Sequence, residues 1–444
     1  MLKRAFVVLI GLMIFFVHAF SQKYEIYERT LSNGLNVIVV QNPAVPLVTV
    51  ELDVKNGGYT QPPEYEGLAH LYEHMFFKAN EAIPNQERYM ERIRELGASW
   101  NGTTSDERVN YFITLGRDSL EPGMQFMYDA ITAPLFKEEE LVKERPVVLG
   151  EYDRNEANPS FLLFRAIQQK VWWKYYSYKD VLGDRNVIIT ATPEKMHTIQ
   201  HLFYIPNNSA LILAGDITAN EGFDLAEKYF GKWKKGMDPF TTIKIPEHPP
   251  IQRTETIVVE HPVSAASVSI EWQGPSVSKD PKATYAADVF SYILSQQTST
   301  FYKDLVESGL AYGVNFSYNT LNHVGPITLS SRMSPDKYEA CKKAIFAELS
   351  KMMSDDYFTD EQLENAKTIL AIDEQYGREQ ASQYAHTVGY WWAVAGLDYY
   401  LDYVDNVNKV TRDDIKRYLA TYVIDKPYVM GVLVSSEMRK QLGL

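Results

Sequence analysis

The strongest constraint on the fold is a segment that occurs twice in the sequence. Residues 37–43 (VIVVQNP) match residues 256–262 (TIVVEHP) without a gap. One residue out of that register, 48–52 (VTVEL) matches 268–272 (VSIEW). Both copies have the pattern of a strand, a turn and a second strand, and a helical pattern follows each of them. The repeat predicts two similar α+β halves of about 200 residues each.

The two copies are separated by the segment that is most typical of a linker. Residues 236–252 (GMDPFTTIKIPEHPPIQ) contain four prolines and show no helical period. We therefore expect an N-terminal domain over 22–235, a linker over 236–252 and a C-terminal domain over 253–444. The functional motif described below lies in the N-terminal domain, and the C-terminal domain lacks it.

In the N-terminal domain, β-branched runs and helical periods predict a mixture of strands and helices. Strands are expected at 34–40, 47–54, 98–104, 109–115 and 210–213. Helices are expected at 67–79, 85–96, 119–132, 138–156, 160–171, 193–202 and 219–230.

Composition and charge exclude several classes of protein. The 444 residues are 45% hydrophobic and 13% aromatic, which is typical of a folded chain and not of a disordered one. The formal net charge is −13 and there is no basic stripe, so we expect no nucleic-acid partner. The single cysteine, Cys341, excludes a disulfide framework and a cysteine-rich zinc cluster.

Residues 1–21 have the pattern of a secretory signal peptide. Lys3 and Arg4 precede an apolar run over 5–17, and Ala19 and Ser21 supply small residues for a cleavage site. The alternative is an uncleaved anchor, but the run is shorter than the ~20 residues that a spanning helix needs. We therefore expect a secreted or periplasmic protein, with no stable membrane insertion after cleavage.

The most specific motif is His70-x-x-Glu73-His74. On a helix these three side chains share a face about 100° wide, and the apolar residues between them take the opposite face. Two imidazoles at i and i+4 can hold one metal ion, with the carboxylate beside it. The alternative is a chance pattern on a surface helix. His197 and His201 have the same spacing without a neighbouring carboxylate, and we interpret that pair as structural.

Two histidines leave a catalytic zinc ion short of a third protein ligand. Glu144 and Glu151 are the candidates, because seven residues on a helix bring two side chains to within about 20° of one another. Pro146 lies between them, where it is expected to kink the helix or to start it. The alternative for either glutamate is an exposed acid. The spacing does not decide between the two.

The motif and the two glutamates that follow it resemble those of the pitrilysin/insulinase family of zinc peptidases. The resemblance is specifically to the half-length members of the family, which are similar to mitochondrial processing peptidase subunits. In that family the motif is followed by two glutamates seven residues apart, of which the later one binds zinc. The resemblance continues in several short segments. These are 101–105 (NGTTS), 181–183 (VLG), 204–208 (YIPNN), 214–216 (AGD) and 308–312 (SGLAY).

The resemblance implies a fold and a zinc site. The fold would be two homologous α+β domains, each a mainly antiparallel sheet covered by helices. One zinc ion per chain would be held by His70, His74 and Glu151. Glu144 would support catalysis by orienting a ligand.

The resemblance also implies hydrolysis of peptide bonds by a metalloendopeptidase. Glu73 would take the proton of a zinc-activated water and return it to the leaving amine. The strand expected at 98–104 is similar to the family's edge strand, where an extended or unfolded peptide adds as another strand.

One departure from the family concerns substrate binding. Members that act alone place an arginine seven residues before the equivalent of Tyr312, and the pair holds the substrate backbone. Here Leu305 occupies that position, and Lys303 is the nearest base. We therefore expect a dimer of two copies, or a heterodimer with a similar half-length subunit that carries the arginine. The alternatives are a zinc-bearing or scaffold subunit that is inactive alone, and a peptide-binding subunit that does not cleave.

Overall fold

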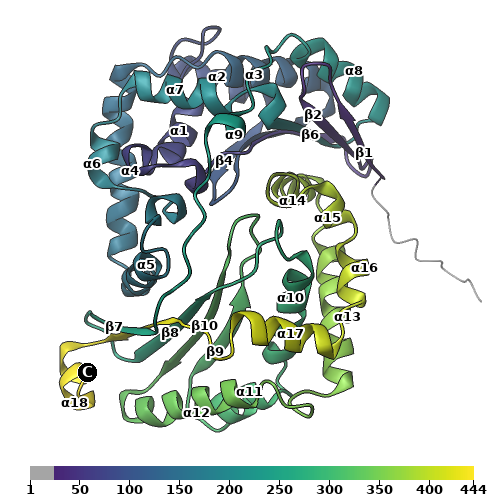
Figure 1. The fold of residues 1–444 in the computed structure, drawn as a ribbon. Helices are drawn as coiled ribbons and strands as arrows, with labels where there is room; N and C mark the ends of the chain where they lie inside the picture. Colours follow the sequence, from purple (N-terminus) through teal and green to yellow (C-terminus); the bar gives the residue numbers. More distant parts are fainter. Residues whose placement is uncertain (1–24) are drawn as a thin grey trace, which may run out of the picture.

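The computed structural model describes residues 25–444, and these residues form two β-sheets with helices around them (Figure 1). The expected signal peptide, residues 1–21, lies outside the described residues. No helix within 25–444 is both long and apolar enough to cross a membrane.

The first sheet has six strands. They are β1 (Glu25–Thr30), β2 (Asn36–Gln41), β3 (Leu47–Val54), β4 (Ser99–Thr104), β5 (Val109–Gly116) and β6 (Ser209–Gly215). Their order is β1-β2-β6-β3-β5-β4, and all neighbours are antiparallel except β2 and β6. The five expected strands are confirmed. The prediction missed β1, because its residues are polar and largely exposed and carry no apolar alternation.

The second sheet repeats this order with one strand fewer. Its strands are β7 (Glu255–Glu260), β8 (Ala266–Gln273), β9 (Gly313–Tyr318), β10 (Pro326–Met333) and β11 (Val429–Val434), in the order β7-β11-β8-β10-β9. As in the first sheet, one pair alone, β7 and β11, is parallel. The internal repeat is therefore confirmed by topology: β2 and β7 occupy equivalent places, and so do β3 and β8.

The helices of the first half confirm the seven expected ones. They are α1 (Leu68–Phe76), α2 (Gln86–Leu96), α3 (Leu120–Thr132), α4 (Glu138–Glu156), α5 (Pro159–Val171), α6 (Arg185–Ile189), α7 (Pro193–Phe203) and α8 (Ala219–Phe230). The short α6 was missed. Pro146 neither starts nor ends α4, contrary to one expectation. It removes one backbone bond, to the carbonyl of Val142, a residue that is 53% exposed at the surface.

The segment between the sheets contains one short helix, α9 (Pro239–Thr242), which the proline-rich pattern did not predict. Pro239 occupies the first turn, and the Asp238 side chain accepts a hydrogen bond from Phe240 N, so the turn is capped. Residues 243–254 form neither helix nor strand.

The helices of the second half cover the second sheet and connect it to the first. They are α10 (Pro281–Ser295), α11 (Thr300–Tyr302), α12 (Tyr338–Lys351), α13 (Asp360–Tyr376), α14 (Ala381–Val394), α15 (Leu397–Leu401), α16 (Tyr403–Asn408), α17 (Arg412–Tyr422) and α18 (Ser436–Leu442). A single π-helical turn at Lys303–Glu307 follows α11.

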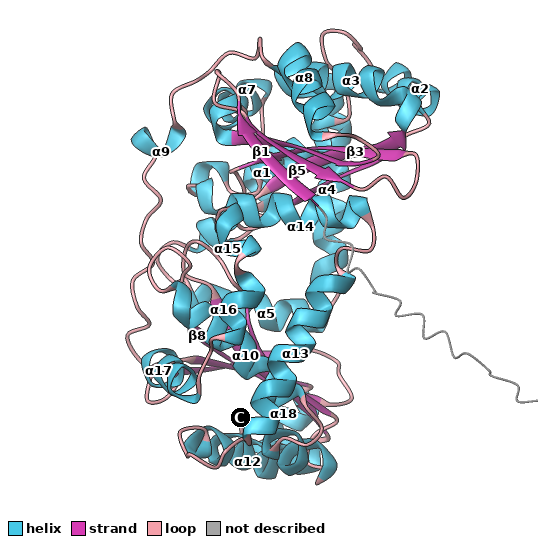
Figure 2. Cartoon of the chain, turned by 90° about the vertical axis from the view of Figure 1, so that its right-hand side faces the viewer, coloured by secondary structure: helices cyan, strands magenta, loops and turns pink. Residues whose placement is uncertain are grey.

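One helix from each half of the chain packs on the sheet of the other half. Helix α14 packs its apolar side chains on β2 and β6, and it lies directly against the first sheet in Figure 2. Helix α5 packs in the same way on β7 and β11 of the second sheet. Because this exchange is reciprocal, each half buries a face of its sheet only with the help of the other half.

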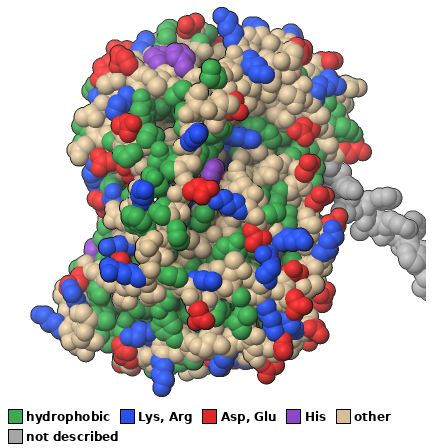
Figure 3. Space-filling model, viewed as in Figure 1, with side chains coloured by type: hydrophobic (Ala, Val, Ile, Leu, Met, Phe, Trp, Pro, Cys, Tyr) green, Lys and Arg blue, Asp and Glu red, His purple; other side chains and the backbone are tan. Residues whose placement is uncertain are grey.

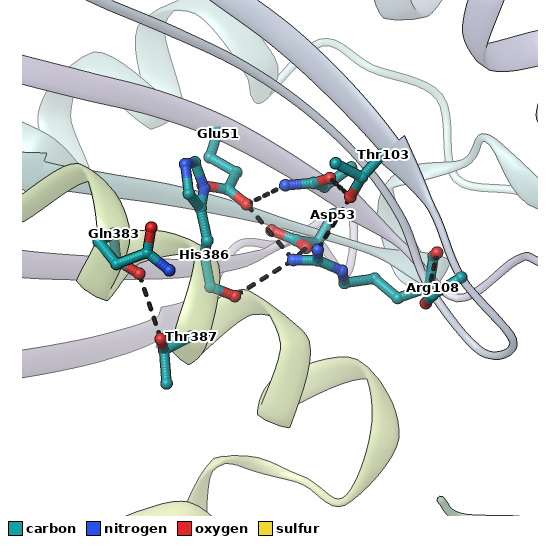
Figure 4. A network of polar contacts seen from close by, with 9 residues as sticks. Glu51, Asp53, Thr103, Arg108, Gln383, His386 and Thr387 are labelled. Carbon is teal, nitrogen blue, oxygen red and sulfur yellow. Dashed lines mark hydrogen bonds and ion pairs between the residues drawn. The ribbon is translucent and has the colours of Figure 1, made fainter. Parts of the chain in front are cut away.

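Buried polar contacts accompany the exchange at two glutamates that the repeat makes equivalent, Glu51 and Glu271. His386 of α14 is hydrogen bonded to Glu51, and Arg108 joins the same network (Figure 4). Gln168 of α5 donates to both carboxylate oxygens of Glu271, each at 2.7 Å. Burial raises the pKa of Glu271 to about 8.

Candidate metal centre

Helix α1 turns its motif side chains away from the core. It begins after Gly67, whose φ of 87° is a left-handed conformation that glycine adopts without strain. A side chain at Gly67 would also meet the backbone of Leu182 and Gly183, so this close contact requires a glycine. Leu71 and Met75 are buried in the first core, which leaves the opposite face of α1 to the motif.

The structure brings together His70, His74 and Glu151, the three residues that the family resemblance implies as metal ligands. His70 Nε2 lies 3.3 Å from His74 Nε2, and Glu151 Oε2 lies 3.5 Å from the first of these atoms and 3.8 Å from the second. Ligand atoms that bind zinc tetrahedrally at about 2.1 Å are about 3.4 Å from one another. The three side chains can therefore hold one zinc ion, with a fourth position left for water. This is the one cluster of three metal-binding side chains within residues 25–444.

Glu144 contacts the same cluster through Nδ1 of His74, the ring nitrogen that does not face the other two residues. Its Oε1 lies 2.8 Å from His74 Nδ1, and its Oε2 lies 2.5 Å from Lys78 Nζ. Burial alone would raise the pKa of Glu144, but the hydrogen bonds from His74 and Lys78 outweigh it and lower that pKa. The carboxylate is thus charged and fixes the orientation of the His74 ring, as the partner of a zinc-binding histidine commonly does.

The pKa values of the two histidines are shifted in opposite directions. Burial, and then the neighbouring His74, lower the pKa of His70 to about 4, so its ring is neutral and can bind a metal. Burial also disfavours the charged form of His74, but hydrogen bonding to Glu144 and the charge of Glu151 raise its pKa overall. In this arrangement a cation is favoured at the centre of the cluster, either a proton on His74 or a metal ion.

Glu73 lies beside the cluster but does not belong to it. Its Oε2 accepts a hydrogen bond from Thr104 Oγ1 at 2.7 Å, which connects α1 to the end of β4. Burial raises its pKa, and the bond from Thr104 opposes that shift. A carboxyl group of this kind, next to a metal position and not bound to it, can accept and return a proton.

The cluster opens into a pocket of about 330 Å³ that is bordered by β4. Gly102 of β4 lies so close to Glu73 that a Cβ there would be 3.0 Å from Glu73 Cγ. Trp100 is 39% exposed, and the centroid of its ring lies 4.4 Å from the centroid of the Phe77 ring. In the described sheet β4 pairs with β5 alone, so its other edge is open beside the pocket.

Two residues that contact the site, Lys78 and Thr104, were not among those predicted from the sequence. Lys78 stands four residues after His74, and this helical spacing was an available signal. Thr104 lies within the segment 101–105, but nothing in its sequence context indicates a contact with Glu73. His197 and His201 belong to no cluster of three potential metal ligands within residues 25–444, and His197 Nδ1 is hydrogen bonded to Gln200 Oε1.

Leu305 and Tyr312 lie in different surroundings. Leu305 is completely buried in the second core, whereas Tyr312 is 66% exposed. Tyr312 and Arg332 border the same pocket of about 660 Å³, and Tyr312 N donates to Arg332 O at 2.7 Å. An arginine at position 305 would thus have to enter the core. The basic residue near Tyr312 in this structure is instead Arg332, which the sequence spacing did not indicate.

Comparison with known proteins identifies the family. A family model described as insulinase (peptidase family M16) matches residues 36–184, and one described as peptidase M16 inactive domain matches residues 190–370. The chain therefore belongs to the M16 peptidase family, as the resemblance predicted.

Individual relatives agree with this assignment. A zinc protease of Rickettsia felis, itself described as uncharacterized, is 24% identical over 369 residues, which are 82% of this chain and 87% of the relative. Among solved structures, a protease from Helicobacter pylori has a TM-score of 0.83 at 22% identity and covers 93% of this chain and 100% of its own. Pitrilysin has a TM-score of 0.80 at 17% identity, and the match takes in 93% of this chain but 45% of pitrilysin. The two-domain fold is thus shared, and relatives named as zinc proteases support a zinc peptidase.

Proposed function

We propose that this protein is a zinc metalloendopeptidase that hydrolyses extended or unfolded peptides. The observation that carries the proposal is the convergence of three ligand atoms, from His70, His74 and Glu151, with the separate carboxylate of Glu73 beside them. A structural zinc site typically has four protein ligands, whereas a catalytic zinc site needs an open coordination position and a nearby base.

The roles of the side chains follow from their contacts. Zinc, when bound, supplies a Lewis acid that activates water and polarises the scissile carbonyl. Glu73 accepts the proton of the attacking water and returns it to the leaving amine. Thr104 holds the Glu73 carboxylate through its hydroxyl, at 2.7 Å. Glu144 holds His74 through Nδ1, so that Nε2 faces the metal position.

The open edge of β4 supports an extended substrate. A peptide that adds to this edge receives backbone hydrogen bonds along the strand that ends at Thr104, next to Glu73. Binding through the backbone favours peptides in extended conformation over folded proteins. The N-terminal pattern of residues 1–21 supports action in the periplasm or outside the cell.

A dimer is the second part of the proposal. The match with 45% of pitrilysin means that one chain supplies half of that longer protein's fold. A second copy, or a similar subunit with an arginine at the position of Leu305, would face the metal centre and confine the peptide against it. Leu305 favours the second arrangement, because a leucine has no donor with which to hold a substrate carbonyl, whereas a guanidinium does.

The experiment is a peptide-cleavage assay with a fluorescence-quenched peptide, on protein of known zinc content. We expect cleavage that 1,10-phenanthroline abolishes and that added zinc restores. Protein that contains zinc but leaves a panel of unstructured peptides intact, alone and with its partner, would support a binding subunit instead.

A further inference from the structure

A second pocket, of about 520 Å³, lies where the two halves and the segment between them meet. Its volume is within the range typical of small-molecule sites. The face along which the connecting segment runs is shown in Figure 3, where basic, acidic, histidine and hydrophobic side chains meet near mid-height. The pocket wall includes the side chains of Lys55, Tyr59, Glu107, Ile243, Lys244 and His323.

Lys55 is a cation without a close counter-ion. It follows β3 directly and is largely buried, and burial lowers the pKa of its ammonium group although Asp238 attracts it from a distance. Its Nζ lies 4.8 Å from the centre of the Trp392 ring, which compensates part of the lost hydration. Within 25–444 we find no hydrogen bond or ion pair to this Nζ. Its ammonium group is not enclosed, so water or a ligand in the pocket can complete its surroundings.

The acidic residue of the pocket wall is Glu107, and its carboxylate is bound to the second half. Glu107 accepts hydrogen bonds from Asn322 N at 2.7 Å and from His323 N at 2.8 Å, and it lies 2.8 Å from His323 Nδ1. These contacts connect the two halves, and among residues 25–444 no ion pair joins Glu107 to Lys55. Lys244 adds a second positive charge to the wall. The pocket consequently favours an anion.

The rest of the wall is apolar and aromatic. Ile243 and the Phe240 ring come from the connecting segment, and the Phe240 ring stacks on Tyr59 with centroids 5.8 Å apart. The Tyr59 ring also contacts His323, with centroids 5.1 Å apart. A ligand that is complementary to both parts of the wall has a negatively charged group near the lysines and an apolar group near Ile243 and the aromatic rings.

We propose that this pocket binds a carboxylate that carries an adjoining apolar group, with Lys55 as the principal anion contact and Lys244 as the second. Two sources share this chemistry, a free carboxylic acid and the C-terminal residue of a peptide. The second would be a product of the proposed hydrolysis, but binding at this pocket does not depend on that activity. Since the ligand would touch both halves and the segment between them, binding would stabilise their arrangement.

Calorimetric titration of the full-length protein with three probes tests the chemistry. Sodium octanoate represents the free acid, N-acetyl-leucine represents a peptide C-terminus, and N-acetyl-leucinamide lacks the charge. We expect one of the two carboxylates, or both, to bind saturably with one site per chain, and the amide to bind about tenfold more weakly or not at all. Equal binding of N-acetyl-leucine and its amide, or no binding of any probe, would overturn the proposal.

Variants locate the site and separate it from the metal centre, which could also bind a carboxylate. Lys55→Met keeps the aliphatic stem over Trp392 but removes the charge, and we expect about tenfold weaker binding. Lys234→Met is the matched control, an exposed lysine outside the pocket, and we expect no change. Carboxylate binding that survives in the Lys55→Met protein at full strength belongs to another site and contradicts the assignment. If that variant does not fold, the comparison of acid and amide still decides.

Discussion

Two glutamates of one helix have different surroundings in the metal centre. Glu151 has a side chain that is 30% exposed, and it contributes one oxygen to the cluster with the histidines. Glu144 has a side chain that is 8% exposed, and both of its oxygens are bound, to His74 and to Lys78. The first can serve as a ligand that faces the pocket, and the second as the group that orients a ligand.

This difference gives opposite expectations for two conservative variants. Glu151→Gln removes a charged ligand and should lower zinc content sharply. Glu144→Gln should retain most of the zinc and slow peptide hydrolysis by about 10–100-fold, because His74 loses its orienting carboxylate. Zinc per chain, measured by atomic emission after dialysis, distinguishes the two. The reverse order of zinc content would exchange the assigned roles.

The sequence predicted the motif contacts because a helix fixes them locally. The spacing of His70 and His74 places both rings on one face whatever surrounds the helix. The choice of Glu151 over Glu144 required the family resemblance, since both point toward α1. The bond from Thr104 to Glu73 depends on how β4 lies over α1, and such a contact between distant segments leaves no local pattern.

At the scale of elements, the exchange of α5 and α14 between halves is the feature that the sequence did not reveal. Helical patterns predict that α5 forms, and they indicate its apolar face. They do not tell which sheet covers that face, because its partner strands lie in the other half of the chain. The equivalent places of β2 and β7 in the two sheets were predictable, since the repeated segments align directly.

The docking of α14 can be tested at Gly389. A Cβ there would lie 2.3 Å from Asp53 Oδ2, so Gly389→Ala must displace α14 or the buried carboxylate. We expect a loss of about 1–3 kcal/mol in the free energy of unfolding, measured by urea denaturation.

Gly150→Ala is the matched control, because Gly150 is also helical and a Cβ there meets nothing within 4 Å. Here we expect a gain of up to ~1 kcal/mol from helix propensity. Equal effects of the two substitutions would mean that α14 is not packed against Asp53 as closely as described.

At the scale of the molecule, the proposed dimer can be tested by measuring peptide cleavage. The chain has the metal centre, but it has the buried Leu305 where family members that act alone have an arginine. The chain purified alone should cleave peptides at least about tenfold more slowly than the same chain with a half-length subunit that carries the arginine. Restoring the arginine within this chain is not an equivalent test, because Leu305→Arg would bury a charge in the second core. Activity and sedimentation velocity, measured on the same samples, check the expectation. Full turnover by the isolated monomer contradicts the dimer.

The most direct test of the account is zinc content and peptide hydrolysis measured together for Glu73→Gln. All three ligand side chains are unchanged in this variant, so it should bind as much zinc as the parent protein. Its proton acceptor is lost, so hydrolysis in the active assembly should fall by about 10²–10⁴-fold. A protein with full zinc and almost no activity is the predicted result. Hydrolysis at the parental rate would contradict the assignment of Glu73 and, with it, the proposed mechanism.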